Sequence, residues 1–201
     1  MPKLTYWKRF WGHLSTVLRH KWYVFKNCCK AGIVWRGIIH DMSKFSPTEF
    51  FESVEYYQGN DSPINACKKD KGISYAWMHH KGRNSHHYEY WTDYYDTGTI
   101  AQKMPYEDAI EMVCDYIAAG MAYSYNAKKK FSYKDELKWW EEKKKSNPKM
   151  NTHTFLFVDK MMTTMAEEES NNCLKQDKSK YFYEILEDVI KMEERNKTKN
   201  V

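Results

Sequence analysis

The first thirty residues repeat apolar side chains at steps of three and four, the spacing that places side chains on one face of an α-helix. The members of this repeat are Leu4, Trp7, Trp11, Leu14, Leu18, Trp22, Phe25 and Cys29. The repeat predicts a long amphipathic helix over residues 3 to 30 that packs on the protein's own core. Because the helix also carries basic residues, a membrane surface is the alternative contact for it.

Helical signals continue along the rest of the chain, which has only eight glycines and five prolines, too few for many tight hairpins. Further helices are expected over about 33–39, 46–57, 73–81, 105–125, 132–146, 152–169 and 178–196, with a polar loop over 60–72. Ser46 to Glu49 has the pattern of a capping box, with Glu49 as its carboxylate. No segment reads as a strand, so the 201 residues predict one all-α domain of seven or eight helices.

Cysteine usage and charge limit the class of protein. The five cysteines form no CxxC pair, and the N-terminus lacks a secretory apolar segment, so a reducing cytoplasm is expected. No run reaches the length of a membrane span, and no membrane partner is expected. The net charge of +5 is mild, and the lysines between 128 and 149 read as a solvated helical face. Nucleic acid is therefore an unlikely partner.

The stretch "AWMHHKGRNSHHYEYW", residues 76 to 91, holds four of the eight histidines. A packed core would struggle to satisfy so many ring nitrogens. Asp115 stands among apolar residues on an expected helix, where a carboxylate needs a partner, and His40-Asp41 ends another helix, where both side chains can turn toward one ion. Imidazoles and carboxylates together favour one or two divalent transition metal ions, with Fe, Mn, Zn, Co and Ni as candidates.

The order His20, then His40-Asp41, then the histidine cluster, then Asp115 resembles the HD domain superfamily of metal-dependent phosphohydrolases. "IIHDMSKF" is similar to its His-Asp run, and "VCDYIAAGMAY" is similar to its closing helix. The resemblance implies an HD-domain-like helical bundle, with a metal-binding core over about 10–125 and a C-terminal helical extension over about 126–201.

The chain resembles more closely a bacterial and phage family of unknown function. The motifs that carry this likeness are "HKWYV", "HDMSKFSPTEF" and the pattern HH…N.HH.E, and it covers about residues 13 to 170. That family has no established activity. The closer likeness therefore supports the family grouping, and the expected chemistry rests on the superfamily resemblance.

The superfamily resemblance implies a role for particular residues. The expected metal ligands are His20, His40, Asp41, His80, His86 and Asp115. His13, one heptad before His20 on nearly the same helical face, is the alternative first ligand. Lys44 and His87 are the expected catalytic residues: Lys44 contacts the phosphate, and His87 protonates the leaving oxygen or holds the nucleophile. Asn84 and Trp91 are the candidates for substrate binding.

The function that follows is a metal-dependent phosphohydrolase that acts on a small-molecule phosphate ester, foremost a nucleotide. Two alternatives keep the same site. One is a di-iron oxygenase, which metal identity and an oxygen-dependent optical change would distinguish. The other is a non-catalytic module that binds a metal or a nucleotide. The C-terminal helices either cover the pocket or form the contact of a homodimer.

Overall fold

The computed structural model describes residues 4–59, 61–96, 98–146, 148–170, 184–185, 187–192 and 195. Within them the chain is mostly helical, as the sequence predicts. The α-helices are α1 (Tyr6–Lys30), α2 (Val34–Ile39), α3 (Pro47–Tyr56), α4 (Pro63–Lys71), α5 (Tyr75–Lys81), α6 (Tyr106–Asn126), α7 (Tyr133–Lys145) and α8 (Thr152–Ser170). The shorter elements are the 3-10 helices η1 (Met42–Phe45) and η2 (Tyr88–Trp91) and the strands β1 (Thr92–Tyr95) and β2 (Gly98–Ala101).

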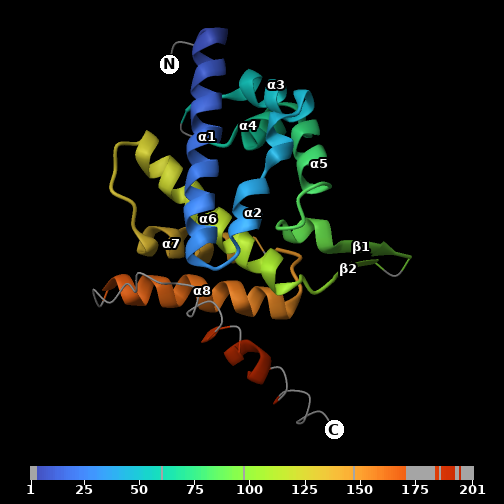
Figure 1. Cartoon of the computed structure of the whole chain (residues 1–201). Helices are drawn as coiled ribbons and strands as arrows, with labels where there is room; N and C mark the ends of the chain where they lie inside the picture. Colours follow the sequence, from blue (N-terminus) through green and yellow to red (C-terminus); the bar gives the residue numbers. More distant parts are fainter. Residues whose placement is uncertain are drawn as a thin grey trace.

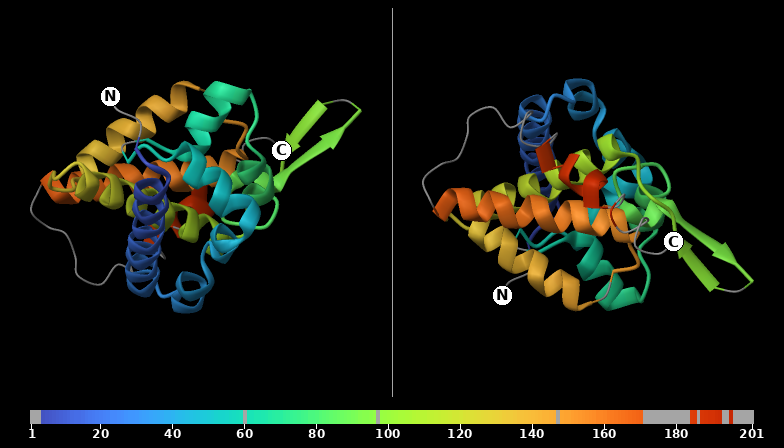
Figure 2. Two further views of the ribbon diagram at one scale, coloured as in Figure 1. Left: turned by 90° about the horizontal axis from the view of Figure 1, so that it is seen from above. Right: turned by 90° about the horizontal axis from the view of Figure 1, so that it is seen from below.

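Helix α6 lies at the centre of the molecule, with α1 packed along one side and α8 crossing the other (Figure 1). Helices α2 and α3 pack on α1, α4 and α5 pack on α3, and α7 packs on α8. The views from above and below show the same order, with the β1–β2 hairpin extending away from the body (Figure 2). The central helix is therefore covered on two sides, and its side chains divide between two environments.

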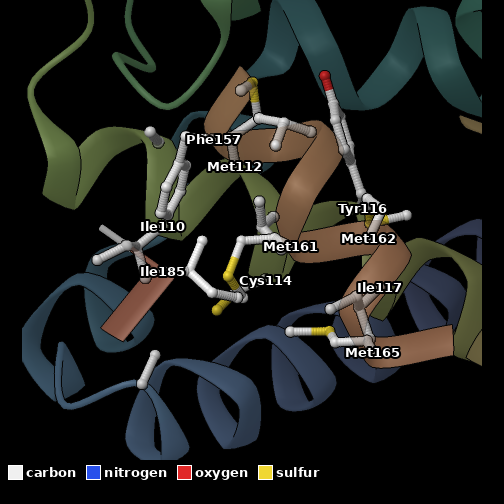
Figure 3. Packing of buried hydrophobic residues seen from close by; sticks show 14 of the residues in the cluster. Ile110, Met112, Cys114, Tyr116, Ile117, Phe157, Met161, Met162, Met165 and Ile185 are labelled. Carbon is white, nitrogen blue, oxygen red and sulfur yellow. The ribbon is translucent and has the colours of Figure 1, made fainter. Parts of the chain in front are cut away.

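One side of α6 builds the apolar core with α8 (Figure 3). Ile110 and Ile117 of α6 pack there among Phe157, Met161 and Met165 of α8, and all five side chains are at most 2% exposed. Residues three or four apart share a helical face, so the acidic positions 108, 111 and 115 fall on the other side of α6. The apolar core thereby fixes the direction in which these carboxylates point.

Helix α1 is present as predicted, but the expectation that its apolar repeat packs on the core is wrong. The buried residues of α1 are His13, Val17, His20, Val24 and Cys28. The repeat itself faces outward, with Trp7 66%, Trp11 61% and Trp22 56% exposed. The narrow side chains of Val17, Val24 and Cys28 let α1 approach α6 closely, whereas tryptophans would hold the two helices apart.

Two segments differ from the sequence prediction. The expected loop over 60–72 contains α4, which begins at Pro63. Gly72 follows its last residue and terminates the helix, and the φ of 75° at this position suits glycine. Residues 92–101, for which no strand was expected, form the antiparallel hairpin of β1 and β2 with Tyr95 opposite Gly98. Only four residues per strand and a mostly exposed surface leave little alternation of apolar and polar residues to detect.

The end of the chain is described only in part. Of the helix expected over about 178–196, the described residues 184–185 and 187–192 are helical, and the rest lies outside the described residues. Ile185 and Val189 are buried in the same core cluster as α6 and α8. In the described part of the chain, no helix combines the length and the apolar character that crossing a bilayer requires.

Candidate metal centre

The site is centred on the turn that follows α2, where His40 and Asp41 are adjacent in sequence. His40 leaves the helical conformation with φ −47° and ψ 130°, and Asp41 adopts the left-handed conformation with φ 53°. A left-handed aspartate costs roughly 1 kcal/mol of backbone strain, a cost that is common at functional sites. The two side chains turn to the same side, which brings His40 Nε2 within 3.1 Å of Asp41 Oδ2.

Four other side chains, from α1, α5, the loop that follows α5, and α6, converge on this turn. His80 from α5 and His86 from the following loop each place Nε2 3.3 Å from Asp41 Oδ1. His20 from α1 lies on the other side, with Nε2 3.8 Å from Asp41 Oδ2 and 2.9 Å from Asp115 Oδ1. The six residues predicted as metal ligands are therefore all brought together in one place.

The polar atoms at the centre of this cluster are buried and lack hydrogen-bond partners. They are both carboxylate oxygens of Asp41 and the Nε2 atoms of His20, His40 and His86. Although the Nε2 atoms of His20, His40 and His86 lie 3.1–3.8 Å from the Asp41 oxygens, none meets hydrogen-bond geometry. Buried polar atoms are normally paired, and each unpaired one costs about 1–3 kcal/mol. One or two cations held between these atoms would pair them, so the residues fit a metal site.

Two glutamates hold the imidazoles in this orientation. His40 Nδ1 lies 2.8 Å and His86 Nδ1 3.3 Å from Glu111 Oε1. His80 Nδ1 lies 2.7 Å from Glu49 Oε2, and His79 Nδ1 2.6 Å from Glu49 Oε1. An imidazole that donates Nδ1–H to a carboxylate leaves the Nε2 lone pair free for a metal ion. Of these rings, those of His40, His80 and His86 direct Nε2 toward Asp41.

Sequence reasoning missed both glutamates in this role. Glu49 was assigned to a capping box, and its backbone nitrogen does lie 3.4 Å from Ser46 Oγ. Its carboxylate, however, binds His79 and His80, so the capping prediction is wrong for the side chain. Glu111 carries a signal that could have found it, because it lies four residues before Asp115 and so shares its helical face.

The ligand atoms form overlapping groups that could each hold one ion. One group is His20, His40, Asp41 and Asp115, and another is Asp41, His80, His86 and His87. Asp41 belongs to both groups and offers a different oxygen to each, Oδ2 to the first and Oδ1 to the second. Each group holds four N or O donors, a number that suits a divalent transition metal ion.

The remaining predicted residues lie at varying distances from this centre. Lys44 Nζ lies 2.6 Å from Asp41 Oδ2. His87, expected as a catalytic residue, places Nε2 2.9 Å from His80 Nε2 and so stands among the possible ligands. His13, the alternative to His20, belongs to none of the ligand groups found among the described residues.

Asn84 and Trp91, expected to bind substrate, serve as supports in the structure. The amide nitrogen of Asn84 donates to Ser43 Oγ at 2.8 Å and to the carbonyl of His80 at 2.7 Å. The indole nitrogen of Trp91 donates to the carbonyl of Ser85 at 2.7 Å, and its ring packs against the apolar core. The structure thus places both residues in the wall that shapes the histidine loop, and their contact with a substrate stays a prediction.

Comparison with known proteins identifies the family of this chain. A model described as a family of unknown function, DUF5662, matches residues 9–192. The chain belongs to DUF5662. No curated protein and no solved structure matches it. All of the converging histidines and carboxylates lie inside the matched range, so the centre is part of the region that defines this DUF5662 member.

Burial and charge set the protonation of the site. Burial alone would raise the pKa of Asp41, but the charges of His40, Lys44 and His80 outweigh it and hold that pKa well below its usual range. Burial alone would likewise raise the pKa of Asp115, but the nearby His20 and His40 outweigh it and hold that pKa well below its usual range. The site of this DUF5662 protein therefore presents two ionised carboxylates, the charge that a divalent cation needs.

A cavity of about 200 Å³ adjoins the centre. His20, Lys44 and Asp115 form the end of the cavity nearest the ligand cluster. Its other walls come from α1, α3, α6 and the segment that leads into α4. A reactant in this DUF5662 cavity would therefore lie directly against the cluster.

Proposed function

We propose that this protein is a metal-dependent phosphohydrolase of the HD-domain type, which cleaves a nucleotide or another phosphate ester with an activated water. The observation that carries the proposal is the group of buried Nε2 atoms, none of them hydrogen-bonded, around an Asp41 carboxylate that has an ion pair with Lys44 but no hydrogen bond. Such an arrangement is costly unless a cation occupies it. The small cavity at its edge supplies room for a reactant.

One or two divalent ions in the two overlapping ligand groups would supply Lewis acidity and lower the pKa of a water to about 7. Glu49 and Glu111 keep the imidazoles turned toward this position through their Nδ1 atoms. Lys44, whose pKa burial lowers but Asp41 and Asp115 raise to about 12, remains a cation at the cavity edge. It offsets charge on the phosphoryl oxygens.

His87 moves the proton in this scheme. In this scheme His87 stays uncoordinated. Burial, followed by the charges of His86 and His80, holds its pKa well below the usual range, so the ring is neutral before the reaction. As the water oxygen bonds to phosphorus, its proton passes to His87. The bond from phosphorus to the leaving oxygen breaks, and that oxygen takes the proton back from His87. The products are an alcohol and inorganic phosphate.

The compartment follows from the same proposal. Among the described cysteines, Cys28, Cys29 and Cys67 are free thiols. Free thiols support a reducing, cytoplasmic environment, in which a transition metal can also be supplied to the site.

Elemental analysis of the purified protein, together with a phosphate-ester assay, tests the proposal. We expect bound transition metal and hydrolysis, both lost in Asp41→Ala and both kept in the control Asp135→Ala, whose side chain is 70% exposed. Turnover that persists in Asp41→Ala with stoichiometric metal would discard the scheme. Two irons with an oxygen-dependent optical change would favour the oxygenase alternative, and metal without turnover would favour a binding module.

A further inference from the structure

We infer that the cavity beside the metal centre selects a small phosphate monoester whose remaining part is uncharged and carries hydroxyl groups, and that it excludes nucleoside di- and triphosphates. The inference rests on the proposed function and names the substrate class of the same site. It restricts the expected substrates from nucleotides in general to small monoesters, and it depends on three properties of the cavity.

The first property is size. The cavity has a volume of about 200 Å³. A cavity of roughly 150 Å³ holds benzene, and drug-sized ligands occupy roughly 300–1,000 Å³. The space beside the metal centre therefore admits one small ring or a short carbon chain, whereas a base and a ribose together would not fit inside it.

The second property is charge. Among the described residues that line the cavity, Lys44 is the one lysine or arginine, and its Nζ already lies 2.6 Å from Asp41 Oδ2. The carboxylates of Glu49 and Asp61 also line the walls. A polyphosphate needs several cations or hydrogen-bond donors along its length. A second or third phosphate would approach Asp61 and find no unpaired cation among the described residues, because Lys44 pairs with Asp41 and the neighbouring Lys69 pairs with Asp61 at 3.3 Å, so a single phosphate at the metal centre is favoured.

The third property is the rest of the cavity wall, where neutral polar groups lie among apolar side chains such as Val17, Ile64 and Ala122. Thr16, Ser53, Tyr57 and Tyr123 contribute hydroxyls there, and Thr16 Oγ1 lies 3.1 Å from Tyr57 Oη. Hydroxyls both donate and accept hydrogen bonds, so they pair with the hydroxyls of a polyol or a sugar fragment. The wall therefore matches an uncharged, oxygen-rich group.

His13 completes this wall and is the residue to which we assign specificity. It is 8% exposed, lies on α1 two turns before His20, and packs its ring against Phe50 and Tyr57. Burial and the nearby Lys44 lower its pKa to about 4, so its ring is neutral at pH 7 and offers one donor and one acceptor. Neither ring nitrogen belongs to the ligand groups found among the described residues, which leaves His13 available to a substrate hydroxyl.

Steady-state hydrolysis by the full-length, metal-loaded protein tests the inference, with glycerol phosphate, adenosine monophosphate and adenosine triphosphate as substrates. We expect kcat/KM for glycerol phosphate to exceed that for adenosine triphosphate by at least about 100-fold, because two unpaired charges and excess volume oppose the larger substrate. In His13→Ala, KM for glycerol phosphate should rise about tenfold with kcat nearly unchanged, since the lost contact binds ground state and transition state equally. The conservative His13→Asn should recover part of that loss.

Binding provides the second measurement. Inorganic phosphate should inhibit glycerol phosphate hydrolysis competitively, and tripolyphosphate should do so at least about tenfold more weakly. Faster hydrolysis of adenosine triphosphate, or tighter inhibition by tripolyphosphate, would overturn the inference and leave the proposed phosphohydrolase in place. If the metal-loaded protein hydrolyses none of the three substrates, the proposed function fails and the inference falls with it.

Discussion

At the scale of single residues, the site depends on carboxylates that orient histidines. Glu111 contacts His40 and His86 through Oε1 and accepts from Arg36 through Oε2 at 2.9 Å. Burial would raise its pKa, but the two histidines outweigh this and lower it to about 2. The ionised carboxylate of Glu111 therefore positions His40 and His86. A neutral amide would weaken these contacts without changing the shape of the side chain.

We therefore expect Glu111→Gln to lower metal affinity by roughly 10- to 100-fold, as removal of a partner behind a liganding histidine commonly does. Competition with a chromophoric chelator measures this change. The matched control is Glu107→Gln, because Glu107 also contacts Arg36, at 3.2 Å, but is 70% exposed and touches no histidine of the site. Equal metal affinity in the two variants would show that Glu111 does not orient ligands.

A second residue-scale prediction concerns Glu136 of α7, whose carboxylate packs against Gly120 of α6. Burial, followed by the charge of Asp135, raises the pKa of Glu136 from 4.5 to about 7. Because the folded pKa is above the unfolded one, the stability it contributes is full below about pH 4.5 and is lost as the pH rises to 7. Above that, the ionised group opposes folding.

Glu136→Gln should therefore be more stable than the unchanged protein at pH 8, by about 1–2 kcal/mol, and equally stable near pH 4. Urea unfolding at the two pH values measures the difference. The exposed Glu142→Gln, whose side chain is 70% exposed and pairs with Lys145, is the control and should show no such pH dependence. A constant difference between Glu136→Gln and the unchanged protein at both pH values would contradict the shift.

The sequence identified the histidines and aspartates that converge in the cluster better than the side chains that support them. Side chains such as Asp115 and His40-Asp41 are recognisable because a polar group in an apolar helix, or at a helix end, requires a partner. Glu49 and Glu111 were missed because acidic residues on helices are usually solvent-exposed or capping, and only their pairing in space reveals their role. The same limit applies to Asn84 and Trp91, whose side chains support the histidine loop from behind.

At the scale of elements, the sequence located most helices but not the direction in which α1 faces. Periodicity identifies an apolar stripe without stating what covers it, and α1 carries two stripes. The stripe of Val17, Val24 and Cys28 has small side chains and is interrupted by His20, yet it faces α6. The stripe of larger side chains, Trp7, Trp11 and Trp22, is exposed. The close packing of α1 on α6 determines which face of α1 is buried, and His20 lies on that buried face.

Substitutions on the two faces of α1 should have unequal effects. Val24 is fully buried, so Val24→Ala should lower the free energy of unfolding by about 1–3 kcal/mol through lost packing. Trp22, two positions earlier and 56% exposed, should tolerate Trp22→Ser within about 0.5 kcal/mol. Denaturant unfolding compares the two variants with the unchanged protein. A larger loss for Trp22→Ser would mean that α1 packs with the face that its sequence repeat predicts.

At the scale of the whole molecule, the centre joins elements from most of the chain. Its ligand atoms come from α1, the turn after α2, α5, the loop before η2 and α6. These elements meet there at the expense of burying Asp41 and Asp115, which are 3% and 8% exposed. Without a cation the two buried carboxylates depend on Lys44 and the surrounding histidines for their charge balance. Metal binding should therefore stabilise the entire fold rather than one local segment.

A ligand that binds the folded state at about 100 times its Kd adds about 2.7 kcal/mol to the free energy of unfolding. For a domain of this size that corresponds to roughly 5–10 °C in Tm. We expect calorimetry to show a rise of this order when Mn²⁺, Fe²⁺ or Zn²⁺ is added to chelator-treated protein. In Asp41→Asn the rise should vanish and the metal-free Tm should fall, because the Asp41 carboxylate pairs with Lys44 at 2.6 Å and its lowered pKa means that its charge favours the folded state. An unchanged Tm on metal addition to the unsubstituted protein would mean that the clustered charges fold without a cation.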